Sequence, residues 1–542
     1  MAAQTEAHSY RGEEKIIVSI DLGTTHRTGA VSFAHAYPGS DINVRMVTRW
    51  KGQPEAAGDS KIPTIVAYKD GQLVACGAEA RDYLGDEEYE VSKWFKLHLH
   101  PDSMGISDAP PPYGSDTNTM EIPELPTNVS LLMVYSDFMR YLFEGFISFF
   151  EESTPNGAAI WRRLSSGIVI ILTIPNGWDT RQQGFLKQVA QLAGVVQSDD
   201  DAALRIEFVS EGEASVHYVL GKINHNTWLG EGVMFAVTDA GGSTVDSTLY
   251  VCKRLEPKLV LEEVCASECV QVSEGLMLLP IVTDRCIVKA GGVFVDRAAQ
   301  HLLVEKLTGS NYADEGTIGD MVHKFEQRTK RVFDGTQESN VIDFGSRRDN
   351  DRDYNIIQGK ITLTRSEVSS MFDNVVARSV ASCSKLLHRR NIKHLLLVGG
   401  FGESPFLRSR LREEFGNRGT EIVTVEEPSK KAAAEGAVLW YTKQMVAARI
   451  ARFTMGIAIS CRFDAHNEEH MRRRHLADVD ARGDVRLPGA FKNQRIAQNH
   501  SDLSTFTTDY SEKPESLENL QRKILAWEGD GIPEWTRDAK GM

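Results

Sequence analysis

The sequence repeats one short pattern, in which an apolar run is followed by an aspartate, a small turn and a second apolar run. In the first copy the runs are residues 15–20 and 28–33, with Asp21 and a Gly-Thr-Thr turn between them. The second copy surrounds Asp239, 218 residues later, and has a Gly-Gly-Ser-Thr turn. The apolar runs of the second copy are residues 233–237 and 245–251. Short apolar runs bounded by tight turns predict strands joined as hairpins. Two copies predict an internally duplicated fold with one hairpin in each half.

The segments around these hairpins alternate between strand and helix patterns. Residues 168–174 (IVIILTI) form a continuous run of the kind found in strands covered on both faces. The other expected elements are helices at residues 179–193, 291–306 and 405–415 and strands at residues 205–209 and 393–398. Ser404 is the expected N-cap of the last helix and Pro405 its first residue. This alternation predicts an α/β architecture.

The turns of the two hairpins have the composition of phosphate-binding loops. Glycine-rich turns after strands present backbone N–H groups where a phosphate approaches without meeting a Cβ atom. The hydroxyl groups of Thr24, Thr25 and Thr244 would add donors. Asp21 and Asp239 stand at the strand ends, where carboxylates hold a hydrated Mg²⁺ beside substrate phosphates. A single Asp-x-Gly turn is usually only a turn, so this prediction depends on the duplication.

Three stretches of the sequence resemble a known superfamily. IIVSIDLGTT, VTDAGGSTVD and HLLLVGGFGESPFL, in this order, are similar to the two phosphate motifs and the adenosine motif of the Hsp70/actin/hexokinase ATPase superfamily. The first motif is most similar to Hsp70. LTIPNGWDTRQQ and EEPSKKAAAEGAVL resemble its two connecting segments, the second of them at the hinge between lobes. The resemblance covers roughly residues 16–440. Residues 94–97 and the short C-terminal part resemble a divergent branch of Hsp70 relatives, the HSPA-twelve kind.

The resemblance implies an actin-like ATPase fold, two duplicated α/β lobes around a cleft that holds ATP or ADP with Mg²⁺. By position, Glu211 would lie near the metal and the attacking water. The catalytic lysine would be Lys96, with Lys93 as the alternative. Asp21 and Asp239 would contribute to catalysis and hold Mg²⁺ through water. The nucleotide-binding residues that the resemblance implies are Gly23, Thr24, Thr25, Gly241, Gly242, Ser243, Thr244, Gly291, Gly292, Lys330, Arg331, Gly399, Gly400 and Phe401.

The part of the pattern that would bind adenine is incomplete. Hsp70 proteins place an arginine soon after the adenosine glycines, whereas Phe401-Gly402-Glu403-Ser404 follow here. Glu403 therefore stands near the place of the guanidinium. On the other lobe Lys330 and Arg331 align, but the glutamate of the family falls on Gln327. The resemblance supports phosphate binding better than recognition of the base.

About 100 residues follow residue 440, and they show no series of alternating strands. A peptide-binding β-sandwich like that of a full Hsp70 is therefore not expected. The expected function is that of a slow Mg²⁺-dependent ATPase, chaperone-related, whose lobes close as a switch for a protein partner or co-chaperone. Two alternatives stay open: a nucleotide-binding scaffold without catalysis, and a small-molecule kinase of the same superfamily.

Composition argues against several classes of function. Lys plus Arg number 61 and Asp plus Glu 75, and the net charge of −14 disfavours nucleic acid and anionic membranes as partners. The apolar stretch 129–150 contains Asp137, Arg140 and Glu144, so we expect a packed helix there and no membrane span. The seven cysteines and the polar N-terminus indicate a reducing compartment, the cytoplasm or the nucleus.

No structural zinc site is expected. His466 and His470 have the spacing of a zinc-protease helix, but they lie in a polar stretch that suits a solvated face. Cys265 and Cys269 have no second pair of ligands close in the sequence.

The expected organisation has four parts. They are a polar tail (1–14), a first lobe (15–230) with a proline-rich insertion at about 101–127, a second lobe (231–445) that returns to the hinge, and a polar, partly disordered extension (446–542).

Overall fold

The computed structural model of the chain describes residues 10–24, 29–53, 59–100, 123–256, 258–264, 268–269, 291–387, 390, 392–425, 431–448, 454–479, 485–493 and 524–527. These residues form two compact units. The larger unit extends to Val446 and contains both predicted hairpins, and the smaller one begins at Ala447.

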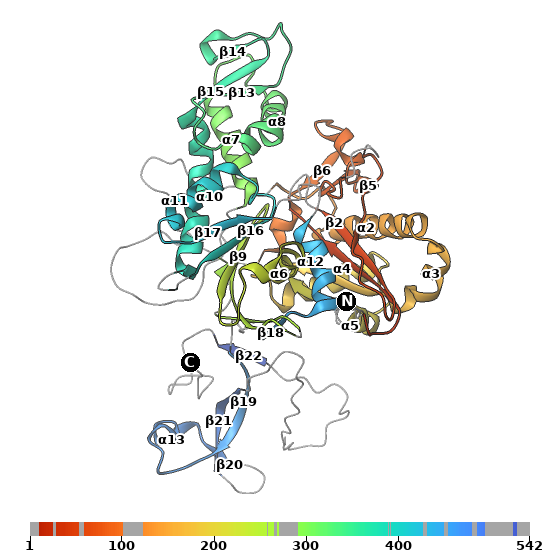
Figure 1. Ribbon diagram of the computed structural model, residues 1–542, viewed down its shortest axis with the longest axis vertical. Helices are drawn as coiled ribbons and strands as arrows, with labels where there is room; N and C mark the ends of the chain where they lie inside the picture. The colour runs from red at the N-terminus through yellow and green to blue at the C-terminus, as the bar shows by residue number, and fades with distance from the viewer. Residues whose placement is uncertain are drawn as a thin grey trace. The chain divides into compact units, whose positions relative to one another are not determined.

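The first predicted hairpin forms the centre of a five-stranded sheet (Figure 1). Its order is β3-β2-β1-β7-β8, with strands β1 (Lys15–Asp21), β2 (Ala30–Ala36), β3 (Arg45–Met46), β7 (Val169–Ile174) and β8 (Ile206–Ser210). β1 pairs antiparallel with β2 and parallel with β7, and β7 pairs parallel with β8. A central strand is covered on both faces, and β1 is accordingly buried from Ile16 to Asp21.

The second predicted hairpin lies in a sheet with the same arrangement. This sheet contains the order β17-β16-β9-β10-β11, with strands β9 (Met234–Ala240), β10 (Val245–Arg254), β11 (Val260–Glu263), β16 (His394–Val398) and β17 (Glu421–Thr424). β9 pairs antiparallel with β10 and parallel with β16, and β16 pairs parallel with β17. The short strand β12 (Glu268–Cys269) also pairs with β10. Both predicted hairpins are therefore confirmed, and each ends in its aspartate-containing turn.

The apolar stretch near residue 140 is the packed helix α2 (Leu131–Ser153). Its internal charges are satisfied locally, because Asp137 accepts hydrogen bonds from the Tyr68 hydroxyl and from Arg140, both at 2.9 Å. α4 (Thr180–Leu192) begins at Asp179, which makes a capping box with Gln182. The remaining elements of this half are α3 (Gly157–Leu164), α5 (Asp199–Arg205) and a small sheet of β4 (Ile65–Lys69), β5 (Gln72–Cys76) and β6 (Glu90–Lys93).

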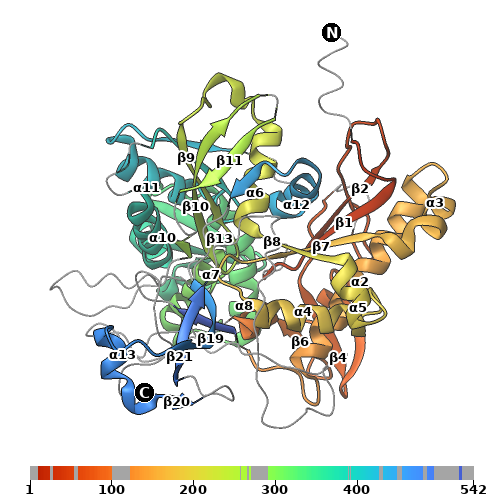
Figure 2. The same cartoon turned by 90° about the horizontal axis from the view of Figure 1, so that it is seen from below.

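Two helices cross between the halves. α6 (Glu211–Lys222) follows β8 of the first sheet but packs on β9 and β10 of the second. α12 (Ala432–Lys443) follows the second sheet but packs on β1 and β2. Figure 2 shows the two helices side by side between the sheets. They touch at Gly436, where an added Cβ atom would overlap the carbonyl oxygen of Ala214, so only glycine allows this close approach.

The rest of the second half is helical with one small sheet. Its helices are α7 (Gly292–Lys306), α8 (Glu315–Lys324), α9 (Lys330–Val332), α10 (Arg365–Leu387) and α11 (Pro405–Gly416), and its sheet consists of β13 (Ser339–Asp343), β14 (Ile356–Ile357) and β15 (Lys360–Thr364). Ser404 caps α11 by accepting a hydrogen bond from the Leu407 backbone N–H. The predicted N-cap Ser404 and first residue Pro405 are confirmed.

The smaller unit contains more regular structure than its sequence suggests. Its described residues form an antiparallel sheet in the order β20-β21-β19-β22, with strands β19 (Thr454–Arg462), β20 (Asp478–Val479), β21 (Val485–Asn493) and β22 (Ile524–Trp527). The sequence after residue 440 shows no series of alternating strands, whereas in the structure β19 and β22 pair across a long separation in sequence. The short helix α13 (Glu468–Arg472) carries His470, whose Nδ1 accepts a hydrogen bond from the Asp464 backbone. β18 (Val446–Ala448) lies at the boundary of the units.

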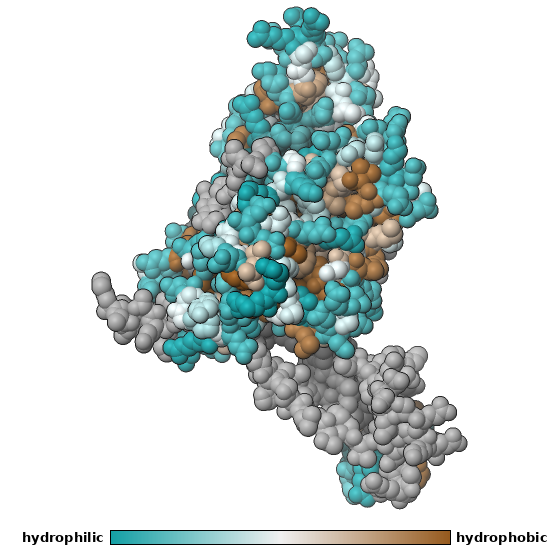
Figure 3. Space-filling model, turned by 90° about the vertical axis from the view of Figure 1, so that its right-hand side faces the viewer, coloured by the Kyte–Doolittle hydropathy of each residue, from teal (hydrophilic) through white to brown (hydrophobic). Residues whose placement is uncertain are grey.

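The described surface is largely hydrophilic on the face drawn in Figure 3, and its hydrophobic residues lie in separate groups. Among the described residues, no helix has both the length and the apolar character that a membrane span requires. Several predicted features lie outside the described residues: the first nine residues, Thr25, Cys265, most of the proline-rich insertion and part of the expected hinge segment.

Candidate functional site

Asp21 ends β1 and points into the interior. It is fully buried, and its Oδ1 accepts a hydrogen bond of 2.9 Å from the hydroxyl of Thr173 on β7. Its Oδ2 lies 3.3 Å from the ammonium nitrogen of Lys431. Gly23 and Thr24 continue the chain into the first turn. The predicted aspartate is therefore held by a neighbouring strand and by a lysine that the sequence analysis did not single out.

Asp239 has the equivalent place on β9 but different partners. Its Oδ2 accepts a hydrogen bond of 2.7 Å from the hydroxyl of Ser215 on α6. Burial and the negative charge of nearby Glu211 raise the pKa of Asp239 to about 7. Asp239 also faces the loop after β16, because a Cβ atom at Gly399 would overlap its Oδ1. Gly399 has a φ angle of +88°, so glycine is required there on two counts.

The two turns meet directly. The hydroxyl oxygen of Thr24 in the first turn lies 2.8 Å from that of Ser243 in the second, and both side chains are buried. The hydroxyl of the next residue, Thr244, instead donates a hydrogen bond of 3.0 Å to Asp246 within the second hairpin. The structure therefore brings the described part of the first turn into contact with the second turn.

The start of α7 packs against the second turn. The backbone N–H groups of Gly292 and Val293 donate to the carbonyl oxygens of Gly241 and Gly242, at 3.1 and 2.9 Å. Lys330 lies next to this contact, and its ammonium donates to the Gly292 carbonyl and to Asp296, at 2.7 and 2.6 Å. Arg331 follows it on α9, and its charge acts on Lys61 across the site.

Glu211 and Lys96 form a buried ion pair. The Lys96 ammonium lies 2.7 Å from Glu211 Oε1, and their side chains are only 4% and 11% exposed. The same ammonium lies 5.5 Å from the centre of the Trp178 ring, so an aromatic face covers its other side. Lys93, the alternative candidate, instead lies over the ring of Trp94. Of the two candidate lysines, the structure brings Lys96 to Glu211.

The loop predicted to bind adenosine is also part of the site. Phe401 is 3% exposed and its ring stacks on Phe372 in the core, so Phe401 does not line the pocket. Glu403 extends from the same loop and its carboxylate lies 3.7 Å from the ammonium of Lys61. Lys61 belongs to the first half of the chain, so this ion pair bridges the halves. The residue that departs from the Hsp70 pattern thus makes a contact that the sequence did not reveal.

Lys431 is the residue of the site that sequence reasoning missed. It precedes α12 and ends between the carboxylates of the two turns. Burial alone would lower the pKa of Lys431, but the nearby carboxylates, Asp21 foremost, raise it above its ordinary value. The side chain therefore stays charged. The sequence gives one weak indication of its position, since Lys431 comes directly before three alanines. Small residues let the start of a helix pack closely against strands, which would bring the preceding side chain near them.

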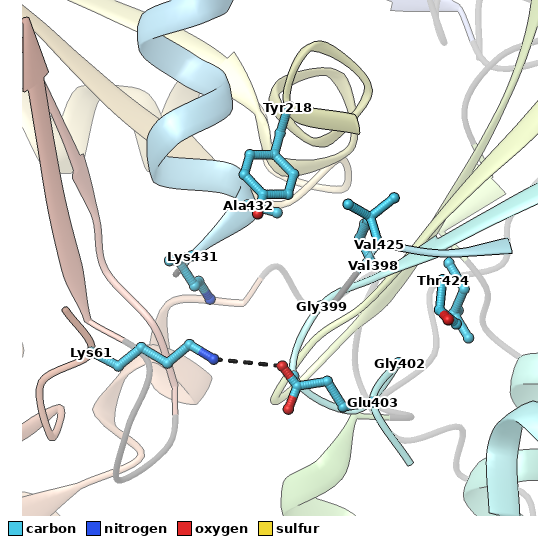
Figure 4. Close-up of a pocket in the computed structure, with 12 residues that line it drawn as sticks. Lys61, Tyr218, Val398, Gly399, Gly402, Glu403, Thr424, Val425, Lys431 and Ala432 are labelled. Atoms are coloured by element: carbon cyan, nitrogen blue, oxygen red, sulfur yellow. Dashed lines mark ion pairs between the residues drawn. The ribbon is translucent and has the colours of Figure 1, made fainter. Parts of the chain in front are cut away.

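A small pocket lies beside Lys61, Glu403 and Lys431. Its free volume is about 40 Å³, and it is lined by Lys61, Tyr218, Gly399, Gly400, Gly402, Glu403, Thr424, Val425, Lys431 and Ala432, among others. Figure 4 shows Lys61 and Lys431 pointing into it, with Glu403 opposite Lys61. Such a volume holds a few water molecules, whereas pockets for small molecules commonly exceed about 300 Å³. The pocket beside Lys61 and Lys431 is therefore narrow in the described structure.

The aspartate pair is a poor match for the predicted Mg²⁺. An ammonium group already stands beside Asp21 Oδ2, and one oxygen of each aspartate accepts a hydrogen bond from a hydroxyl, Asp21 Oδ1 from Thr173 and Asp239 Oδ2 from Ser215. The described residues contain no cluster of three or more histidine, cysteine, aspartate or glutamate side chains arranged to hold a metal. Mg²⁺ prefers oxygen ligands in an open octahedral arrangement, and a neighbouring ammonium opposes it by charge.

Known proteins resemble the chain over most of its length. Human heat shock 70 kDa protein 12B is 22% identical to it over 83% of this chain and 72% of its own length. The chain is a distant relative of the Hsp70 proteins. Human heat shock 70 kDa protein 12A is 20% identical over the same shares. The Chaperone protein HscA homolog of Colwellia psychrerythraea is 22% identical over 79% of this chain and 58% of its own length. No family model matches the chain. The resemblance to Hsp70 predicted from the three motifs is confirmed.

Proposed function

We propose that this Hsp70 relative has an actin-like ATPase fold and binds ATP in the cleft between its two sheets. The observation that carries the proposal is the direct contact of the two duplicated turns through Thr24 and Ser243, 2.8 Å apart. Turns rich in backbone N–H groups that converge from two sides suit a chain of phosphates. The open side of Gly400, in the loop after β16, provides the neighbouring place for the nucleoside.

The chain's own residues would position ATP and assist its hydrolysis. The N–H groups of both turns would bind phosphate oxygens, and the ammonium groups of Lys96 and Lys431 would offset their charge. Glu211 would orient a water molecule whose oxygen attacks the terminal phosphorus. The bond from that phosphorus to the bridging oxygen breaks, ADP and phosphate leave, and the proton of the water passes to solvent by way of Glu211. Because Lys96 holds Glu211 in an ion pair, we expect turnover to be slow.

Binding would change the closure of the two halves. The narrow pocket would have to widen to admit a nucleotide, and the Lys61–Glu403 ion pair across it would then open. A second bridge stands further out, where the Arg297 guanidinium lies 4.7 Å from the centre of the Trp94 ring. A ligand that separates such contacts shifts a closed state toward a more open one. This supports a nucleotide-driven switch that a protein partner could read.

The test is ATP affinity measured by calorimetry on a variant that fills the pocket. A Cβ atom at Gly400 meets nothing within 4 Å, so Gly400→Trp leaves the fold intact and places an indole in the nucleoside site. Gly416→Trp is the matched control, since Gly416 is equally open and lies at the end of α11, away from the pocket. We expect Gly400→Trp to raise the Kd for ATP at least about tenfold and Gly416→Trp to leave it within about twofold. Equal affinities in both variants would contradict the proposal.

A nucleotide-binding scaffold without catalysis is the second candidate, and the Lys96–Glu211 pair favours it by occupying the carboxylate. Glu211→Gln separates the two. We expect phosphate release from ATP to fall about 100-fold if Glu211 orients the water. Glu207→Gln, an exposed carboxylate on the preceding strand, should change nothing. Wild-type protein that binds ATP and releases no phosphate above background would establish the scaffold.

A further inference from the structure

We infer that Lys431 takes the place of a divalent cation in this cleft, so that ATP binds there in its metal-free form. The inference rests on the proposed function, which names ATP as the ligand, and it specifies the state in which ATP is bound. The observations are the position of the Lys431 ammonium, the anchoring of its backbone, and the other charges that surround it.

The ammonium of Lys431 stands where the predicted metal would bind. It lies 3.3 Å from Asp21 Oδ2, and the carboxylates of Glu211 and Asp239 also act on it. Asp21 is fully buried, and the Lys431 side chain is only 19% exposed. A divalent cation beside Asp21 would therefore meet a buried positive charge at short range. The ammonium supplies to the carboxylates the charge that Mg²⁺ would otherwise supply.

The backbone that carries Lys431 is anchored within reach of Asp21. Lys431 is the N-cap residue of α12, and its carbonyl accepts a hydrogen bond from the Glu435 backbone at 3.1 Å. Three residues further along, the carbonyl of Ala434 accepts a hydrogen bond of 2.6 Å from the Ser32 hydroxyl on β2. Ala433 and Ala434 are themselves buried. The backbone of Lys431 could therefore move away from Asp21 only if the start of α12 left the first sheet.

Lys61 faces the same pocket and completes a positively charged wall. In the described structure it is paired with Glu403 at 3.7 Å, and the Glu403 side chain is 42% exposed. An incoming phosphate chain can take the place of the Glu403 carboxylate, because both are anions and Glu403 is free to turn toward solvent. The phosphates would then lie between Lys61 and Lys431. Lysines bind phosphate oxygens as point charges and need no metal bridge.

The inference concerns the ionic form of the ligand. ATP without metal is a multiply charged anion whose oxygens accept hydrogen bonds from ammonium groups, whereas Mg²⁺-ATP presents a cation to the protein. A site built with lysines at the metal position favours the first form and opposes the second.

The experiment is a calorimetric titration of the full chain with ATP, once in EDTA and once in excess Mg²⁺. We expect wild type to bind ATP in EDTA at least as tightly as in Mg²⁺. The affinity of Lys431→Met for ATP should be about tenfold or more lower than that of wild type in EDTA. Its ATP binding should become dependent on Mg²⁺, because the metal can then approach Asp21. Lys360→Met removes an exposed lysine of β15 and should match wild type in both buffers.

The outcomes separate the two proposals. Wild-type binding that is about tenfold tighter with Mg²⁺, with Lys431→Met no different from Lys360→Met, would overturn the inference and keep ATP as the ligand. Absence of ATP binding in both buffers would overturn the proposed function itself, and the inference with it. If Lys431→Met does not fold, Lys431→Arg, which retains the charge, takes its place and should bind ATP in EDTA as wild type does. The affinity of wild type for ATP in the two buffers still decides whether the metal is needed.

Discussion

The turn after β1 and the turn after β9 occupy equivalent places in two sheets with the same strand order, yet their aspartates have different partners. Asp21 faces the ammonium of Lys431 and the hydroxyl of Thr173. Asp239 faces the hydroxyl of Ser215, and burial with the charge of Glu211 raises its pKa to about 7. One aspartate is thus paired with a cation, while the other is placed to take up a proton.

This difference teaches that duplication of the backbone does not duplicate the chemistry. The same hairpin geometry recurs because strand pattern and turn composition recur, and both are local properties. The polar groups that face each aspartate include one from a helix that crosses from the other half, Lys431 at the start of α12 for Asp21 and Ser215 on α6 for Asp239. The crossing helices therefore decide what each turn can bind.

The largest expected effect comes from separating the crossing helices. Gly436→Ala places a methyl group against the Ala214 carbonyl, which belongs to a helix backbone and cannot turn away. We expect the free energy of unfolding to fall by about 3 kcal/mol in urea denaturation. The control is Gly221→Ala, also in this region, whose added methyl would meet only a flexible Leu439 side chain at 3.1 Å. Equal stability of the two variants would show that the helices can separate freely.

Neutralising the two aspartates one at a time tests the comparison itself. Asp21→Asn leaves the Lys431 ammonium without its nearest carboxylate. We expect the free energy of unfolding to fall by about 2 kcal/mol at pH 7, less than for a fully buried pair because the Lys431 side chain is 19% exposed. Asp239→Asn should not lose stability at pH 7, because the raised pKa means that burial disfavours the ionised carboxylate and the neutral amide removes that penalty. Denaturation of both variants in urea measures the difference. Equal losses would mean that the turns are electrostatically alike.

The pH dependence of stability sharpens the same contrast. The pKa of Asp239 is about 7 in the folded chain against an ordinary value of 3.8, so the folded state binds the proton more tightly. The contribution of Asp239 to stability is therefore fully present below pH 3.8 and falls as the pH rises to about 7. The difference in unfolding free energy between wild type and Asp239→Asn should change in this direction, by up to about 1.4 kcal/mol for each pH unit over that range. A difference that is flat between pH 4.5 and 7.5 would contradict the raised pKa.

The smallest effect concerns the contact between the turns. A double-mutant cycle of Thr24→Ala and Ser243→Ala isolates the hydrogen bond of 2.8 Å between their hydroxyls. We expect a coupling energy of about 1 kcal/mol without ligand, since one neutral hydrogen bond contributes this much. The coupling should vanish when ATP is present, because the phosphates would stand between the turns. Coupling that persists in saturating ATP would mean that the turns stay in contact.

Much of the fold could be predicted from the sequence because its signals are local. Both hairpins, α4 with its cap at Asp179, and α11 with Ser404 and Pro405 follow from patterns within a dozen residues. The sheet of the smaller unit was missed, since β19 pairs with β22 across more than sixty residues and neither strand is distinctive alone.

The site was predictable only in part. Asp21, Glu211 and Asp239 stand on recognisable motifs, but Lys431 reaches Asp21 across 410 residues of sequence. No local pattern reports such a contact. Phe401 was expected to bind the nucleotide because it follows two glycines, whereas its ring is buried in the core.

Hydrogen–deuterium exchange with and without ATP, in EDTA, tests most directly whether the two turns act as one phosphate site. The account predicts that the backbone amides of Gly23 and Thr24 and those of Gly241 to Thr244 become protected together when ATP is added. Protection of one turn alone, or of neither turn while ATP is bound elsewhere, would contradict it.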